Sequence, residues 1–372
     1  MFARRLSSGW LYDRFYRKTL DGSVLCRRAF ARARSGFRPG GDSVLNHSYD
    51  ITHYYHSGFS VAGGDTLLVF DYWRGEEGEL TEDLQLTPAR IRSFAHVIVF
   101  ISHEHIDHFD PVVFSWKDLT DVSYIVSSDM PVGTRGKRMA PGDVYAPVDG
   151  VNITAYDSTD LGVSFLVDFR GLRLFHAGDL NFWHWREEST MQDIEEADAE
   201  FRKAVAPLSA ARIDVAFFPV DPRQGTMYEA GANYFILTVK PRILIPMHYF
   251  HRADVALEYA RTATCRSTEV IAMPVYGESM TLEEDEDGYF NIQMKEAPRA
   301  EEETTVVPAV PDEAYPEQIP AESMPPESAP AEPPADEPPA YSAPAEASPE
   351  ADPFDDSDLP VSQLSESGEE DV

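Results

Sequence analysis

Residues 97–111 read VIVFISHEHIDHFDP, in which five apolar residues lead directly into a group of three histidines and an aspartate. The apolar run predicts a buried strand. Side chains two positions apart in an extended segment project to the same side, so His103 and His105 can reach one metal ion. If the chain then turns into a helix, Asp107 and His108 lie about one ligand shell away. The spacing therefore indicates two adjacent metal positions at the end of a strand.

Solvated loop histidines are the alternative interpretation of this group. The whole chain contains 11 histidines, so three of them at this spacing beside an aspartate are improbable by chance. A polar cluster at the edge of a sheet also has no use in packing. The two cysteines, Cys26 and Cys265, are far apart in the sequence. They form neither a disulfide framework nor a zinc ribbon, so any metal would be held by His, Asp or Glu.

The elements around the motif alternate strands and helices after an initial meander of strands. Strands are predicted at residues 51–55, 59–62, 66–70, 97–101, 122–127, 151–156, 162–169, 172–175, 215–219, 243–246, 270–273 and 279–282. Helices are predicted at residues 87–94, 190–205, 227–239 and 253–264. The expected architecture is a sandwich of mixed sheets covered by helices, of the α/β class.

The histidine and aspartate spacing resembles the His-x-His-x-Asp-His motif of the metallo-β-lactamase superfamily, which is met in full by His103, His105, Asp107 and His108. The resemblance covers roughly residues 49–282. It implies the four-layer αββα sandwich of that superfamily. The sequence around Gly178 and Asp179 is most similar to the branch that contains ascorbate-phosphate lactonase and other small hydrolases.

Three more positions match landmarks of the superfamily. Asp71 closes an early strand and resembles the aspartate that supports the metal loop without binding metal. Asp179 is similar to the carboxylate that bridges two metals, and His248 matches the last histidine ligand. The resemblance thus implies six metal ligands, which are His103, His105, Asp107, His108, Asp179 and His248.

One landmark of the superfamily is missing. Its members usually carry a further histidine, the third nitrogen ligand of the first metal, between the first motif and the Gly-Asp pair. This chain has no histidine between His108 and His176. The candidates for this vacant ligand position are Asp160, Asp157, the Ser158 hydroxyl and a water molecule.

The missing histidine makes the two expected metal positions unequal. The first metal position would keep His103, His105 and Asp179. The second would be complete with Asp107, His108, Asp179 and His248. Because carboxylate in place of imidazole shifts a site from zinc toward manganese or iron, we expect two divalent ions, zinc or manganese with iron as a further candidate. The second position is expected to bind more tightly.

Such a centre supports metal-assisted hydrolysis. Two cations about 3.5–4 Å apart share a water and lower its pKa from ~15.7 toward neutrality, which produces a hydroxide nucleophile. Attack on a carbonyl or phosphorus builds oxyanion charge that the metals stabilise. Asp107 is the expected catalytic residue, and either it or a nearby side chain would relay a proton to the leaving group. The predicted function is hydrolysis of a small ester, lactone, amide or phosphoester.

Three other features are candidates for the site, each with a structural alternative. His56 lies in a turn that can approach the metals and contact metal or substrate, or it is a structural turn histidine. His176, three residues before Asp179, either orients a ligand or binds metal itself. Residues 181–185 read NFWHW and line a substrate pocket or pack a helix on the sheet.

Charge divides the chain into three parts. Residues 297–372 hold 21 acidic residues and one basic residue, and therefore −20 of the net charge of −33. They also hold 16 of the 28 prolines, so we expect a disordered acidic tail. Residues 1–41 hold ten basic and two acidic residues, which suits a disordered basic leader, an organelle transit peptide or an over-extended translation start. Residues 42–296 remain as the hydrolase domain.

Composition also excludes several classes of protein. No run approaches the ~18–20 apolar residues of a membrane span, and two cysteines suit a reducing cytoplasm. The net negative charge argues against nucleic acid as a partner, and counts against a ribonuclease. The expected partner is a small-molecule substrate, while the tail is a candidate site for a protein partner.

Two other functions stay open beside hydrolysis. Relatives with the same loop act as iron-dependent oxygenases or oxidases, although these depend on the nitrogen ligand absent here or on a flavin domain. A binding protein with a degenerate metal site and an acidic recruiting tail is the other alternative. An enzyme would keep its turnover without residues 297–372, whereas an adaptor would lose its partner.

Overall fold

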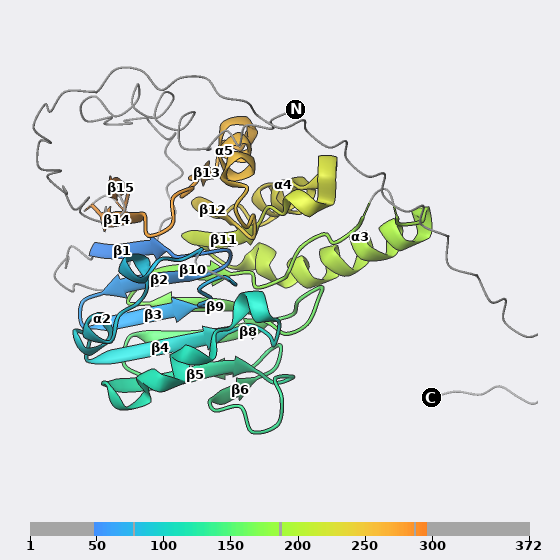
Figure 1. Ribbon diagram of the computed structural model, residues 1–372. Helices are drawn as coiled ribbons and strands as arrows, with labels where there is room; N and C mark the ends of the chain where they lie inside the picture. Colours follow the sequence, from blue (N-terminus) through green and yellow to red (C-terminus); the bar gives the residue numbers. More distant parts are fainter. Residues whose placement is uncertain (1–47, 77–78, 186–187, 286–287, 296–372) are drawn as a thin grey trace, which may run out of the picture. The chain divides into compact units, whose positions relative to one another are not determined.

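The computed structural model describes residues 48–76, 79–185, 188–285 and 288–295. The predicted basic leader and acidic tail lie outside the described residues and stay predictions. Two mixed β-sheets form the centre of the described part (Figure 1).

The first sheet has eight strands, and its order places the earliest and the latest strands side by side. The order is β15 (Phe290–Lys295), β14 (Ser279–Glu284), β1 (Ser48–His53), β2 (Phe59–Gly63), β3 (Thr66–Phe70), β4 (His96–Ile101), β5 (Asp121–Ser127) and β6 (Lys137–Met139). Neighbours from β15 to β3 are antiparallel, whereas β3 to β6 are parallel.

The second sheet has seven strands and the same division into antiparallel and parallel halves. The order is β13 (Glu269–Val270), β12 (Ile243–Met247), β11 (Val215–Pro219), β10 (Leu172–His176), β9 (Ser164–Phe169), β8 (Val151–Tyr156) and β7 (Val144–Tyr145). Strands β10 to β13 are parallel, and β7 to β10 are antiparallel. Since carboxyl ends of parallel strands share an edge, residues that follow β10, β11 and β12 are brought together.

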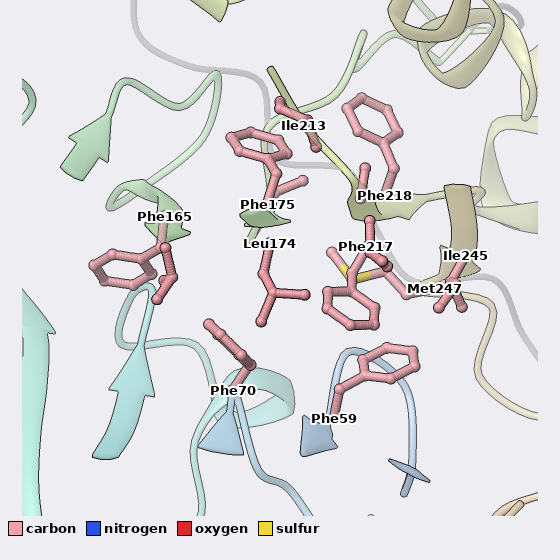
Figure 2. Close-up of a cluster of buried hydrophobic side chains, with 14 of the residues drawn as sticks. Phe59, Phe70, Phe165, Leu174, Phe175, Ile213, Phe217, Phe218, Ile245 and Met247 are labelled. Carbon is pink, nitrogen blue, oxygen red and sulfur yellow. The ribbon is translucent and has the colours of Figure 1, made fainter. Parts of the chain in front are cut away.

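The core lies between the inner faces of the two sheets, as Figure 2 shows. Phe59 of β2 and Phe217 of β11 have ring centroids 4.4 Å apart across the interface. Phe70 of β3 lies 6.1 Å from the same Phe217 ring. The strands supply these rings because their apolar runs bury both faces, one against the other sheet and one against helices.

Helices cover both outer faces, which gives four layers. Ile91 and Trp116 join the buried cluster on the outer face of the first sheet. Phe235 packs on the second sheet, with its ring centroid 4.5 Å from that of Phe218. On the first sheet lie α2 (Pro88–Arg92) and the 3-10 helix η3 (Pro111–Asp118), and on the second α3 (Met191–Val205), α4 (Ala230–Thr238) and α5 (Ala253–Thr262). The predicted αββα sandwich is confirmed.

Helix starts follow ordinary capping chemistry. Thr87 accepts a hydrogen bond from the Arg90 backbone N–H, and Pro88 occupies the first turn of α2. At α3, Thr190 and Asp193 form a reciprocal capping box. Shorter 3-10 helices are η1 (Glu82–Leu84), η2 (Ile106–His108), η4 (Ala206–Ala210) and η5 (Pro222–Met227).

The predicted elements differ from the observed ones in a few places. The helix expected at residues 227–239 begins at Ala230, because η5 with Gly225 at φ +60° precedes it. The strand expected at 270–273 ends at Val270, where its pairing with β12 stops. Strands β6, β7 and β15 were not predicted. No helix in the described part is long and apolar enough to cross a membrane.

Replacing Phe217 by alanine tests the packing between the sheets. The side chain is fully buried, so we expect the free energy of unfolding to fall by about 3–5 kcal/mol. Urea denaturation measures the loss. Leu237→Ala on α4 is the control, because that side chain is 61% exposed and should change stability by less than about 0.5 kcal/mol. Equal losses in both variants would contradict this core.

Candidate metal centre

The four residues of the His-x-His-x-Asp-His motif follow β4 directly. His105 has extended backbone, and Asp107 and His108 lie in the 3-10 helix η2. His103 and His108 are buried, Asp107 is partly exposed and His105 is exposed. Nε2 of His103 lies 3.1 Å from Nδ1 of His105. The tight turn of η2 thus directs two pairs of side chains to neighbouring points.

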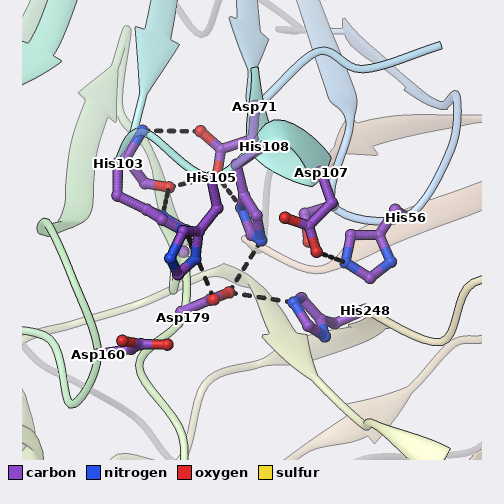
Figure 3. A network of polar contacts seen from close by, with 12 residues as sticks. His56, Asp71, His103, His105, Asp107, His108, Asp160, Asp179 and His248 are labelled. Carbon is purple, nitrogen blue, oxygen red and sulfur yellow. Dashed lines mark hydrogen bonds and ion pairs between the residues drawn. The ribbon is translucent and has the colours of Figure 1, made fainter. Parts of the chain in front are cut away.

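Asp179 lies at the centre of the cluster (Figure 3). Its Oδ1 is 2.9 Å from Nε2 of His108 and 3.1 Å from Nε2 of His248. Its Oδ2 is 3.4 Å from Nε2 of His103. The two oxygens therefore face imidazoles of both expected metal positions, as a bridging carboxylate would.

Several of these buried atoms lie at ion-pair distance from one another but make no hydrogen bond in the described structure. They are Oδ1 of Asp179, Nε2 of His108, Nε2 of His248 and both ring nitrogens of His56. An unsatisfied buried polar group costs about 1–3 kcal/mol. Because the atoms converge on one point, a divalent cation would satisfy them together. The residues present therefore fit a metal centre.

Three groups of side chains place their ligand atoms within 4.8 Å of one another. Two of them contain the ligands expected at the first metal position. They are His103 and Asp179, grouped with His108 of the second position, and His105 with Asp160 and Asp179. The second metal position is outlined by His56, Asp107, His108 and His248.

Of the candidates for the vacant ligand position, Asp160 is the residue whose carboxylate lies in one group with His105 and Asp179. Ser158 and Asp157 make local contacts instead. The Ser158 N–H donates to Oδ1 of Asp157, and the Asp160 N–H lies 3.4 Å from Oγ of Ser158.

Two buried carboxylates orient His108 and His248 by bonding the ring nitrogen that does not face Asp179. Oδ2 of Asp71 accepts from Nδ1 of His108 at 2.8 Å, and its Oδ1 accepts from the Ser102 N–H at 2.8 Å. Oδ2 of Asp221 accepts from Nδ1 of His248 at 2.9 Å. Each bond fixes the tautomer that leaves Nε2 free for metal. Asp221 was missed in the sequence, although it follows a buried strand much as Asp71 does.

His176 is in none of the three ligand groups found among the described residues, and its Nδ1 lies 3.7 Å from Oδ2 of Asp71. Its Nε2 donates to the Ser57 carbonyl at 2.9 Å, and its Nδ1 accepts from the Gly178 N–H at 3.2 Å. Gly178 has φ +53°, and a Cβ there would lie 2.8 Å from Cβ of Ser102. His176 therefore holds the turn that carries Asp179, and only glycine fits at position 178.

The aromatic segment after Asp179 divides between two roles. The Trp183 indole donates to the Asp179 carbonyl at 2.7 Å, and its ring lies 5.5 Å from that of His248. Phe182 instead stacks on Phe201 of α3, with ring centroids 6.2 Å apart. Trp183 is thus beside the site, whereas Phe182 packs a helix onto the sheet.

The carboxylates and imidazoles shift one another's pKa in opposite directions. Burial acts to raise the pKa of Asp179, but His108 and His248 lower it well below the usual value. Burial acts to lower the pKa of His108 and His248, but Asp179 outweighs it and both lie above the ordinary value. Burial lowers the pKa of His56 to about 3, aided by His248.

The two-sheet sandwich with a histidine and aspartate cluster at the ends of its parallel strands is the metallo-β-lactamase fold. No family model matches the chain, and no curated protein matches it. The predicted relation to the ascorbate-phosphate lactonase branch stays a prediction.

Solved structures similar to this chain include metallo-hydrolases. Igni18, a metallo hydrolase from Ignicoccus hospitalis, is 17% identical over 63% of this chain and 98% of that chain, with a TM-score of 0.48. YhfI from Bacillus subtilis, a metallo-beta-lactamase fold protein, is 14% identical over 61% and 96%, with a TM-score of 0.42. CmlA, a diiron beta-hydroxylase from Streptomyces venezuelae, is 11% identical over 65% and 55%, with a TM-score of 0.41.

Asp221→Asn tests the support of His248. The substitution keeps the shape but removes the charge, so we expect zinc affinity to fall about 10- to 100-fold. Competition with a zinc chelator measures it. Asp214→Asn is the control, because Asp214 is a buried carboxylate at the opposite end of β11, paired with Arg212 and Arg242. Unchanged affinity in Asp221→Asn would contradict the assigned role.

Zinc binding should release protons at pH 7. Because the pKa values of His108 and His248 are raised, the metal-free protein holds protons that a metal must displace. These protons are lost as pH rises through the raised pKa values, so zinc affinity should increase from pH 6 to pH 8. Calorimetry in two buffers of different ionisation enthalpy counts the protons. Affinity that does not change with pH would contradict the ion-paired cluster.

Proposed function

We propose that the protein is a metal-dependent hydrolase that uses water to cleave a small ester, lactone, amide or phosphoester. The convergence of unsatisfied buried ligand atoms on Asp179 supports this function. His105 and Asp160 are exposed, whereas His108 and His248 are buried. A substrate can therefore reach the first metal position directly.

The ligand residues divide between two ions, zinc or manganese. Divalent ions supply a Lewis acid and lower the pKa of bound water toward neutrality. The first ion would be held by His103, His105, Asp160 and Asp179, and the second by Asp107, His108, His248 and Asp179.

Asp107 is suited to move a proton. Its side chain is 21% exposed, and its Oδ2 lies 3.4 Å from Nε2 of His56. A carboxylate has two oxygens, so one can hold a metal while the other accepts a proton and passes it to the leaving group.

An aromatic surface with one guanidinium lies beside the second metal position. The Phe250 ring is 5.9 Å from that of His248, and Trp183 lies against the same histidine. Arg223, paired with Asp221, lies 5.1 Å above the Phe250 ring. This surface suits a substrate that carries a ring or a negative charge.

An iron-dependent oxygenase or oxidase is the second candidate, and Asp160 favours it. Two imidazoles combined with carboxylates are ligands typical of non-haem iron. Iron in the purified protein together with consumption of oxygen would support this candidate over hydrolysis.

A panel of lactones, thioesters and phosphodiesters, assayed with Zn²⁺ or Mn²⁺, tests the proposed hydrolase. We expect turnover of at least one class, loss of turnover on chelation and recovery when metal is restored. His103→Ala should lose both metal and turnover. His96→Ala is the control, because His96 begins the same strand and pairs with Asp121 away from the cluster.

Absence of turnover across the panel, with His103→Ala binding as much metal as the wild type, would overturn the proposal. Oxygen consumption by iron-loaded protein, without hydrolysis of any ester, would replace it by the second candidate.

A further inference from the structure

His56 occupies an unusual place in the turn between β1 and β2. Its φ is +54°, a conformation that residues other than glycine seldom adopt. Hydrogen bonds hold it there, from Gly58 N–H to the Tyr55 carbonyl and from His248 N–H to the His56 carbonyl at 3.2 Å. His248 itself has φ +67°. The hydrogen bond between the two histidines thus fixes the backbone of both. Strained backbone of this kind clusters at functional sites, and here it holds the two rings close together.

The imidazole of His56 is fully buried, and neither ring nitrogen makes a hydrogen bond in the described part of the chain. Its Nε2 lies 3.4 Å from Oδ2 of Asp107, at the distance of an ion pair. Its ring centroid lies 3.9 Å from that of His248 and 4.0 Å from that of Phe250. If His56 served only in packing, phenylalanine would fill the place without the cost of unsatisfied nitrogens.

His53, three residues earlier at the end of β1, shows what a structural histidine looks like beside the same turn. It is also fully buried. Its Nδ1 lies 2.8 Å from the Met273 carbonyl, and its Nε2 lies 3.4 Å from the His56 carbonyl. Both of its nitrogens thus face backbone carbonyls. The polar neighbour of His56 is instead the carboxylate of Asp107, 3.4 Å from its Nε2, which is itself a candidate metal ligand. The contrast indicates that a metal ion joins the two side chains.

The geometry admits this ion. The ligand atoms of His56, Asp107, His108 and His248 lie within 4.8 Å of one another. Atoms bound to one ion at about 2.1 Å are at most about 4.2 Å apart, so a small contraction closes the group. Figure 3 shows His56 beside Asp107 and facing His248.

We propose that His56 is a ligand of the second metal position and gives it a third imidazole. This inference rests on the metal centre of the proposed function. The second position then has three imidazoles with carboxylates, whereas the first has two imidazoles with Asp160 and Asp179. Nitrogen-rich sites suit zinc, and oxygen-rich sites suit harder ions such as manganese. The protein therefore binds one zinc tightly at the second position and a harder or weaker-bound ion at the first.

Zinc titration of full-length wild type, His56→Ala and His56→Gln against a chelator tests the proposal. We expect the affinity for the first zinc equivalent to fall by about 10- to 100-fold or more in both variants. Substitution of groups that only orient metal ligands already lowers metal affinity by about that factor. The spectrum of bound Co²⁺ should change in the same variants. His53→Gln, at the end of the preceding strand β1, is the matched control and should keep wild-type zinc affinity. Thermal unfolding checks that each variant folds.

A measurement on the wild type does not depend on any variant's folding. X-ray absorption of protein loaded with one equivalent of zinc should fit three imidazoles rather than two. Two imidazoles, or wild-type zinc affinity and Co²⁺ spectrum in His56→Ala, would overturn the role of His56 while leaving the hydrolase intact. A wild type that binds no metal would overturn both.

Discussion

A buried carboxylate that must be paired is the constraint around which the site is built. Asp179 faces the ring nitrogens of His103, His108 and His248 within 3.4 Å. Burial of a charge is costly unless it is compensated. The imidazoles are in turn oriented by Ser102, Asp71 and Asp221. Loss of any one partner leaves a neighbour unpaired, so the cluster behaves as a unit rather than as separate ligands.

The fold supplies this unit through its parallel strands. Asp71 follows β3, the histidine motif follows β4, and the turns after β10 and β12 carry Asp179 and His248. Asp71 and His248 both adopt positive φ, at +39° and +67°. Such strain persists where the surrounding packing over-determines it. Here the packed sheets hold the strand ends, so the loops beyond them can be strained without loss of order.

The part of the site that depends on local sequence spacing could be predicted. The part that depends on contacts between residues far apart in the sequence could not. The four motif residues were readable because a strand end followed by one tight turn determines where they lie. Asp160 stood beside Ser158 as an equal candidate, because the path of that loop depends on the bond from Gly162 N–H to Asp129. The position of the His56 ring depends on its contact with His248, which lies 192 positions later in the sequence. A local sequence pattern carries no information about such a contact. The short edge strands β6 and β7 were missed because two or three residues carry no periodicity.

The pairing of β1 with β14 has a consequence for how the protein is made. Until residues 279–284 have been synthesised, β1 is an unpaired edge and the turn after it, which holds His56, is supported from one side only. Every proposed ligand precedes β14 in the sequence, so all of them are synthesised before the first sheet gains this strand. The turn that holds His56 therefore gains a neighbouring strand on its second side only late in synthesis.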